Sequence, residues 1–377
     1  MRFFDNSAIN RTYMHSALQI LAEYTGGVFV FVYLLKAGFS VAVVFCALAG
    51  WSIGRLILRG AVLPAALKFG LRNCLIFGTA VDALGYLVLG QIHEPGPLLV
   101  GYILTSAFGN CFYWTCYHAL VATLGNAEKR GSQVSALAAI AALNSILGPL
   151  MGGFLLVHAG AFYGFLVAAL LQAASIVPLL TIQNLQVAPH ATVDAQALKN
   201  ARRIYFADGI INASAYFIWV IALFRTLGEH FDSFGQALAL AGLVGAAMSL
   251  GVGRLIDLGH KKRAQQIAYM IMAVSILVKS LAFVHPLSAV LANALGAVAG
   301  PLYWSAMMSR VYNLGQASAC PLRFQVAGEG AWDLGTAVGC LLAAGLLHLG
   351  FGFFVPLVFG VAACAFGYFA IAKPAAS

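Results

Sequence analysis

The sequence predicts an all-α integral membrane protein, with twelve transmembrane helices arranged in two pseudo-symmetric six-helix bundles. The first observation is composition: of 377 residues, 62% are hydrophobic and only 9% are charged, whereas soluble domains have about 25% charged residues. So few charges cannot cover a folded chain of this size with polar surface, so most of the surface must face lipid. The second and third observations are a series of long apolar runs and an internal repeat. Together they exclude a soluble globular protein.

Apolar runs bounded by polar, Gly or Pro residues define the predicted spans, because a hydrocarbon core of about 30 Å needs roughly 20 apolar residues per helix. The predicted spans cover residues 12–35, 40–63, 71–91, 97–124, 132–157, 161–183, 204–227, 234–257, 266–284, 287–312, 325–348 and 351–372. The long polar stretch 184–203 separates six spans from six. The sequence thus predicts an N-terminal bundle over 1–183, a linker over 184–203 and a C-terminal bundle over 204–377. No cleavage pattern precedes the first span, and we expect it to remain in the mature chain.

The positions of the basic residues predict the orientation, because cytoplasmic loops carry an excess of Lys and Arg. With the N-terminus inside, all but three of the 21 basic residues fall at the inner side, and the three exceptions are Lys36, Arg225 and Lys279. We therefore expect a multi-pass protein of the inner (cell) membrane with both termini in the cytoplasm. This distribution also accounts for the net charge of +9 without a nucleic-acid partner.

The two halves of the chain resemble each other at an offset of about 190 residues. In the fourth predicted span Tyr113-Trp114-Thr115 precedes Leu124-Gly125, and in the tenth Tyr303-Trp304-Ser305 precedes Leu314-Gly315. The first and seventh spans also correspond, through Arg11, Tyr13 and Tyr24 in one and Arg203, Tyr205 and Tyr216 in the other. Matches in the same order at a near-constant offset indicate a duplication of the kind found in transporters.

With these features the chain resembles the major facilitator superfamily over essentially its whole length. The most specific match lies in the fifth span, where Gly148-Pro149-Leu150-Met151-Gly152-Gly153 is similar to the GPxxGG element of the family's proton-coupled exporters. Pro149 removes a backbone donor and bends the helix. Gly148 and Gly152, four residues apart, allow close approach of a neighbouring helix. A packing kink and a conformational role are both open for this element.

Loop signatures add to the resemblance and also depart from it. Residues 253–259 with the basic residues 261–263 resemble the family's loop signature, in which we expect Asp257 to brace the loop; residues 126–131 resemble the loop after the fourth span. The loop between the second and third spans has Leu67 where the family has Asp. The fourth span, at residues 104–110, lacks the arginine that the family's drug exporters have there.

Acidic residues at membrane depth are functional candidates, because a charge at a helix centre costs about 2.5–3.5 kcal/mol on insertion scales. Glu23 lies near the middle of the first span, and Glu329 and Asp333 share one face of the eleventh at a spacing of four. We interpret these three as proton-coupling candidates. The alternatives are a fixed hydrogen-bond acceptor at Glu23, and ion pairing of Glu329 and Asp333. The resemblance implies that the second and eleventh spans meet, which would make Arg55 a gating partner. Asp82 and Asp208 are weaker candidates.

Polar and aromatic residues of the fourth, seventh and tenth spans are predicted to line a central cavity, which the resemblance places between the halves. The candidates are Asn110, Trp114, Tyr117, His118, Asn212, Tyr216, Trp219, Tyr303 and Trp304. The spacings of four and three among Asn212, Tyr216 and Trp219 put these on one helical stripe. The alternative for Tyr and Trp is anchoring at the membrane interface.

The sequence has no nucleotide-phosphate loop and no hydrolase motif, and its seven cysteines lack metal-ligand spacing. We therefore expect neither an enzyme nor a bound cofactor or metal. The predicted function is secondary active transport of a small, amphipathic solute by alternating access, with proton-coupled export as the favoured direction. Proton-coupled uptake or uniport, and a non-transporting membrane sensor or scaffold, are the alternatives. The expected partners are the solute, the proton and the lipid bilayer, and the family resemblance implies a monomer.

Overall fold

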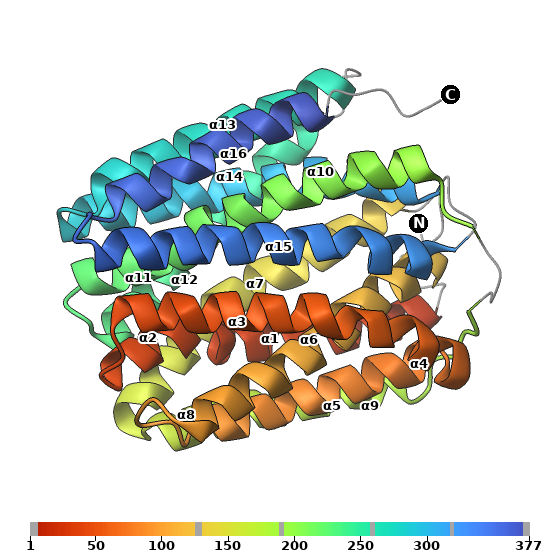
Figure 1. Cartoon of the computed structure of the whole chain (residues 1–377), viewed down its shortest axis with the longest axis horizontal. Coiled ribbons are helices and arrows are strands. Elements are labelled where there is room, and N and C mark those ends of the chain that lie inside the picture. The colour runs from red at the N-terminus through yellow and green to blue at the C-terminus, as the bar shows by residue number, and fades with distance from the viewer. Residues whose placement is uncertain (1–6, 125–129, 188–191, 257–260, 317–319, 372–377) are drawn as a thin grey trace.

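The computed structural model describes residues 7–124, 130–187, 192–256, 261–316 and 320–371, and within these ranges it contains helices and no strand. The helices run roughly along one direction as a bundle (Figure 1). We call the helices of residues 7–179 the N-terminal set and those of residues 195–371 the C-terminal set. Each set occupies its own side of the bundle (Figure 1).

The N-terminal set follows the first six predicted spans. Its elements are α1 (Ser7–Thr25), η1 (Gly27–Phe29), α2 (Val30–Lys36), α3 (Val41–Leu58), η2 (Arg59–Ala61), α4 (Val62–Phe69), α5 (Leu71–Leu89), α6 (Pro97–Leu124), α7 (Arg130–His158), α8 (Ala161–Ala174) and α9 (Ile176–Leu179). Short 3₁₀ turns divide the first and second spans, so each consists of two helical pieces. Pro149 lies inside α7, as the sequence predicts.

The C-terminal set follows the last six predicted spans. Its elements are α10 (Ala195–Asn212), η3 (Ala213–Ile218), α11 (Trp219–Thr226), α12 (Phe231–Ile256), α13 (Lys261–Ala282), α14 (Pro286–Gln316), α15 (Pro321–His348) and α16 (Phe354–Ile371). The segment η3 is a π-helix, which joins α10 to α11 without a break. Because α10 begins at Ala195, the helix covers nine residues of the range predicted as a linker.

Ten helical segments within the described residues are long and apolar enough to cross a membrane. The predicted spans at 97–124 and 234–257 are helical as α6 and α12, but α6 is not among these ten segments and α12 contributes a shorter apolar stretch, Phe231–Ala247. Large apolar side chains remain exposed along the helices, such as Ile57 at 73% and Phe154 at 61%. An exposed apolar belt of this kind fits a protein whose surface faces lipid.

The two sets meet most extensively along two helix pairs, α3 with α15 and α7 with α12, and α6 also contacts α15. Figure 1 shows α3 and α15 side by side across the middle of the bundle. We call the end of the bundle at which α1 begins and α16 ends the terminal end, and the opposite end, with the turns at 37–40 and 227–230, the far end. These cross-set contacts determine which side chains of the first half can reach those of the second.

Candidate functional site

Four buried charged residues join the two sets near the terminal end. Arg55 of α3 pairs with Asp333 of α15, with Nε and Oδ1 2.9 Å apart. Arg59 of η2 pairs with Glu329 at 2.6 Å and with Asp333 at 2.5 Å. None of the four is more than 6% exposed. Two positive and two negative charges cancel here, and each pair has one partner in each set, so we call these residues the ion-pair cluster.

Matched helical spacing makes this arrangement possible. Arg55 and Arg59 are four residues apart, as are Glu329 and Asp333, so each pair lies on one face of its helical segment. Because α3 packs against α15, the two faces meet. Thr115 of α6 also joins them: it accepts a hydrogen bond from Arg59 at 2.8 Å and donates one to Glu329 at 3.2 Å.

A line of polar side chains continues from the ion-pair cluster into the N-terminal set. Arg55 donates to Asn110 Oδ1 at 3.2 Å, and Asn110 donates to Asp82 Oδ1 at 3.1 Å. Gln172 of α8 donates to the second Asp82 oxygen at 3.1 Å. Asp82 is buried and has both carboxylate oxygens satisfied by amide groups. The buried charges of α3 and α5 therefore belong to one connected network.

The guanidinium of Arg55 also lies between two tryptophan rings. Its central carbon is 4.9 Å from the ring centre of Trp51 in α3 and 5.0 Å from that of Trp332 in α15. The two rings meet edge to face at 6.2 Å. A weakly hydrated guanidinium over aromatic faces is favourable when water is excluded. Arg55 thus has aromatic contacts from both sets in addition to its carboxylate partner.

Glu23 lies in α1, apart from the ion-pair cluster. Among the described residues it forms no ion pair, and its carboxylate is close enough to Asp82 for the two charges to interact. Several tyrosines are close enough to Glu23 to interact with its charge, among them Tyr24 of α1 and Tyr216 from η3 of the other set. Tyr216 is 37% exposed. Tyr216 is thus only partly covered by the protein.

The C-terminal set has its own buried carboxylate at Asp208 of α10. Tyr303 of α14 donates to Asp208 Oδ1 at 2.7 Å, and Asn212, one turn further along, donates to the same oxygen at 3.3 Å. Asp208 forms no ion pair within the part of the chain that the structure describes. Asp208, Asn212 and Tyr303 therefore form a compact hydrogen-bonded group.

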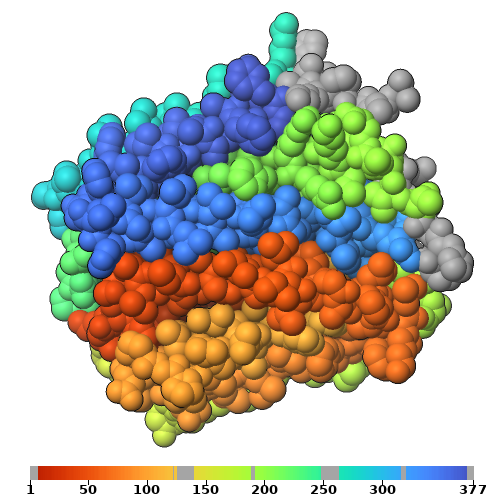
Figure 2. Space-filling view, in the orientation of Figure 1, coloured from red at the N-terminus to blue at the C-terminus, as the bar shows by residue number. Residues whose placement is uncertain are grey.

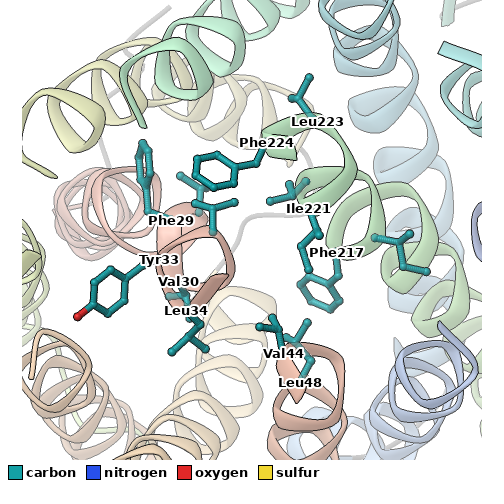
Figure 3. Close-up of a cluster of buried hydrophobic side chains, with 14 of the residues drawn as sticks. Phe29, Val30, Tyr33, Leu34, Val44, Leu48, Phe217, Ile221, Leu223 and Phe224 are labelled. Carbon is teal, nitrogen blue, oxygen red and sulfur yellow. The ribbon is translucent and has the colours of Figure 1, made fainter. Parts of the chain in front are cut away.

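Apolar and aromatic residues join the two sets at the far end. Figure 3 shows Phe29 and Val30 on one side with Ile221 and Phe224 on the other, within one buried cluster. Phe234 of α12 packs its ring 5.5 Å from Phe29 and 5.6 Å from Phe224. We call this the far-end apolar cluster. Contact between the sets is electrostatic toward the terminal end and hydrophobic at the far end.

The GPxxGG element lies where α7 contacts both sets. A side-chain carbon on Gly152 would lie 2.1 Å from the backbone oxygen of Thr25 in α1, and one on Gly153 would lie 2.8 Å from the backbone oxygen of Phe231. A carbon on Gly148 would lie 2.4 Å from Tyr24. The backbones touch at these positions because glycine has no side chain.

The residues predicted to line the cavity fall into two groups by exposure. Tyr117, Trp219 and Tyr303 are at most 7% exposed. Tyr117 bonds Ser16 at 2.8 Å, and Trp219 donates to Asn293 at 2.9 Å, so these rings are packed into the helix bundle. The candidates that keep more exposure are Asn110, Trp114, His118, Asn212, Tyr216 and Trp304. His118 bonds Tyr312 of the other set at 2.9 Å.

Sequence reasoning missed three features of this region. It treated Arg59 as a topology marker, gave Asp82 little weight and placed Lys279 among outer charges. Lys279 is buried in the last turn of α13, where it donates to the Ala215 carbonyl at 2.9 Å and lies 5.3 Å from the ring centre of Trp219. The sequence did contain a signal for Arg59, because Arg55 and Arg59 have the same spacing of four as the two acids of α15. Asp257 lies outside the described residues.

The sequence model of the Major Facilitator Superfamily matches residues 8–321. The chain belongs to this superfamily. Among solved structures, the human organic anion transporter MFSD10 (TETRAN) is similar to it, with a TM-score of 0.69 and 15% sequence identity, over 97% of this chain and 99% of that chain. No curated protein matches the sequence. A superfamily member with this fold is a multi-pass membrane protein and a secondary transporter rather than an enzyme.

Proposed function

We propose that this chain is a proton-coupled exporter of a small, amphipathic solute, which works by alternating access in the inner membrane with the terminal end toward the cytoplasm. The observation that carries the proposal is that the two sets contact each other through charged residues near one end of the bundle and through apolar residues at the other. The ion-pair cluster joins them at one end and the far-end apolar cluster at the other, with Glu23 in neither. Alternating access uses a barrier on each side of the site, and a carboxylate at membrane depth without a cationic partner is a candidate proton carrier.

In the proposed cycle the ion-pair cluster closes the cytoplasmic side. Opening that side separates Arg55 and Arg59 from Glu329 and Asp333, which are buried together. Separating a buried pair is costly as long as each charge stays away from water and from another partner. Water entering the opened side, or a proton on a carboxylate, lowers this cost. The pairs thus provide a barrier that responds to hydration and protonation.

Glu23 is the proposed proton carrier. It has no cationic partner among the described residues, and Asp82 is close enough for like charges to interact. Two neighbouring carboxylates resist simultaneous ionisation, so one proton can be shared between them. Glu329 and Asp333 are secondary candidates, because both arginines already neutralise them in this arrangement.

The residues around Glu23 favour a neutral or cationic amphipathic solute. Tyr24 and Tyr216 offer ring faces and hydroxyl groups, and aromatic faces attract cations. The related human protein is an organic anion transporter, but here both Arg55 and Arg59 are paired with carboxylates. No buried arginine of this cluster is thus available to an anion while the cytoplasmic side is closed.

Flux in proteoliposomes tests the proposal. Purified protein is reconstituted with a pH-sensitive dye inside, a pH gradient is imposed, and neutral, cationic and anionic amphipathic solutes are added in turn. We expect gradient-driven solute movement with opposite proton movement. Glu23→Gln should abolish the proton movement, and Glu94→Gln, an exposed acid in a turn, should leave it unchanged.

The alternatives predict different results. Solute and proton moving in the same direction would indicate uptake, and solute flux that ignores the gradient would indicate uniport. No flux of any solute class would favour a sensor or scaffold. If Glu23→Gln and Asp333→Asn both keep gradient-driven flux, the proton-carrier assignment is wrong.

A further inference from the structure

An open groove of about 500 Å³ lies on the C-terminal set, and its lining includes none of the four residues of the ion-pair cluster. The first turns of α10 and the last turns of α16 form its walls, and these two helices pack against each other. Its lining includes Lys199, Arg202, Arg203, Phe206 and Phe366. Figure 2 shows the start of α10, in green, at the surface next to α16, in dark blue. The groove is therefore open to the surroundings of the protein.

The groove is strongly positive. Its lining has three basic side chains and no acidic one. Across the described ranges, none of the three forms an ion pair, and Arg202 uses only its Nε, which donates to the Ala327 carbonyl at 2.8 Å. Asp194, just before α10, caps the helix through the backbone N–H of Ala197. Asp208, the acid within α10, is buried and accepts a hydrogen bond from Tyr303. The N-terminus of α10 adds its own partial positive charge.

The groove is basic at one end and apolar at the other. The apolar span that contains α10 runs over Ala195–Thr226, so the basic residues lie in its first turns and Phe206 lies one turn deeper. Phe366 is 48% exposed within the apolar span of α16. Basic residues at the end of a span lie at the level of the lipid headgroups, and apolar residues beyond them lie among the acyl chains.

We propose that this groove binds an anionic phospholipid of the leaflet at the terminal end. The guanidinium groups of Arg202 and Arg203 and the ammonium group of Lys199 would hold the phosphate, since guanidinium groups match phosphate geometry. Phe206 and Phe366 would contact an acyl chain. Charge complementarity at one end and apolar surface at the other fit a phospholipid better than a small anion. The site is independent of the transported solute, so it stands even if the proposed function fails.

Lipid binding to the purified full-length protein tests this proposal. Protein in a neutral detergent is titrated with phosphatidylglycerol, phosphatidylcholine or inorganic phosphate, and bound lipid is counted by native mass spectrometry. We expect phosphatidylglycerol to bind more tightly than phosphatidylcholine. A basic residue near an anionic membrane surface contributes about 1 kcal/mol, which corresponds to about fivefold in affinity per charge.

Neutralising the groove should therefore remove most of the preference. The triple variant Lys199→Gln, Arg202→Gln, Arg203→Gln should bind phosphatidylglycerol about 100-fold more weakly by the same contribution per charge. A control triple variant removes the same charge from exposed positions elsewhere, at Lys36, Arg225 and Arg263. It should keep the affinity of the unaltered protein.

Further variants separate the other outcomes. The single variant Arg203→Gln serves if the triple variant does not fold, with about fivefold weaker binding expected. Phe366→Ala should weaken phosphatidylglycerol binding and leave phosphate binding unchanged. Equal affinity for phosphatidylglycerol and phosphatidylcholine, or an equal loss in the control triple variant, would overturn the proposal. Inorganic phosphate binding as tightly as the lipid would show an anion site instead.

Discussion

Replacing Asp333 with Asn should separate the two sets at the terminal end. Asp333 is fully buried and pairs with Arg55 at 2.9 Å and Arg59 at 2.5 Å. Arg59 keeps Glu329 in the variant, so Arg55 becomes the uncompensated charge. Leaving one buried charge without its partner costs about 3 kcal/mol at the lower end of the usual range. Because the pairs bridge the sets, this cost falls on the joined arrangement and shifts the equilibrium toward separation by about 100-fold.

Distances between spin labels measure this shift without a known substrate. Labels at Phe69 of α4 and Gln196 of α10, both exposed and both toward the terminal end, report on the separation of the two sets. We expect a longer and broader distance distribution in Asp333→Asn.

Two controls make the measurement decisive. The exposed Arg225–Glu229 pair, 3.5 Å apart, is worth at most about 1 kcal/mol, so Glu229→Gln should change nothing. Adding Arg55→Leu to Asp333→Asn removes the uncompensated charge and should restore the short distance. A folded Asp333→Asn protein with an unchanged distribution would refute the view that these ion pairs hold the terminal end closed.

Three further predictions concern packing and hydrogen bonds, and each is checked by the apparent melting temperature in detergent. Gly152→Ala should destabilise the protein, because overpacking costs about 1–3 kcal/mol and the new carbon would meet the Thr25 backbone; Gly101→Ala, which has open space, should not. Trp219→Phe should destabilise by about 1–3 kcal/mol, because Asn293 loses its donor, whereas the exposed Trp304→Phe should stay within about 0.5 kcal/mol. Tyr303→Phe should cost a similar amount by removing the 2.7 Å bond to Asp208, and an unchanged melting temperature would mean that water replaces the hydroxyl.

Hydropathy predicted where the helices lie but not where each begins. The range 184–203 is polar and was predicted as a linker, yet α10 begins at Ala195. Residues 195–203 include Ala, Gln, Leu, Lys and Arg, which favour helices without being apolar, and Asp194 caps the first turn. Hydropathy records burial in the hydrocarbon core, so it cannot detect a helix that extends beyond that core.

Helical periodicity failed at one place for a specific reason. Asn212, Tyr216 and Trp219 share a stripe only if the backbone is a regular α-helix, but residues 213–218 form a π-helix. Because a π-helix is wider and has more residues per turn, the spacing of four and three no longer marks one face. Tyr216 accordingly keeps 37% exposure while Trp219 keeps 1%. Residues 213–218 contain no Pro or Gly to mark an irregular turn, so the sequence gives no sign of the π-helix.

The positive-inside rule misplaced the role of Arg59 because it counts each basic residue separately. Arg55 and Arg59 at the end of the second span read as orientation markers, and only their register against Glu329 and Asp333 shows that they pair. That register depends on which helices touch. The family resemblance supplied the contact between the second and eleventh spans, and therefore Arg55 was identified as a partner in advance.

The two closures should differ in what opens them. Charged contacts near the terminal end exchange protein partners for water when the sets separate, so protonation or hydration changes the cost of opening there. The far-end apolar cluster has no titratable pair between its rings, and opening it costs about 25 cal/mol for each Å² of apolar surface exposed. We therefore expect pH to shift the distance distribution at the terminal end and to leave the far end unchanged. A second pair of spin labels, at Lys36 and Glu229, would report on the far end. Equal pH shifts in the distances of this pair and of the pair at Phe69 and Gln196 would show that this division is wrong.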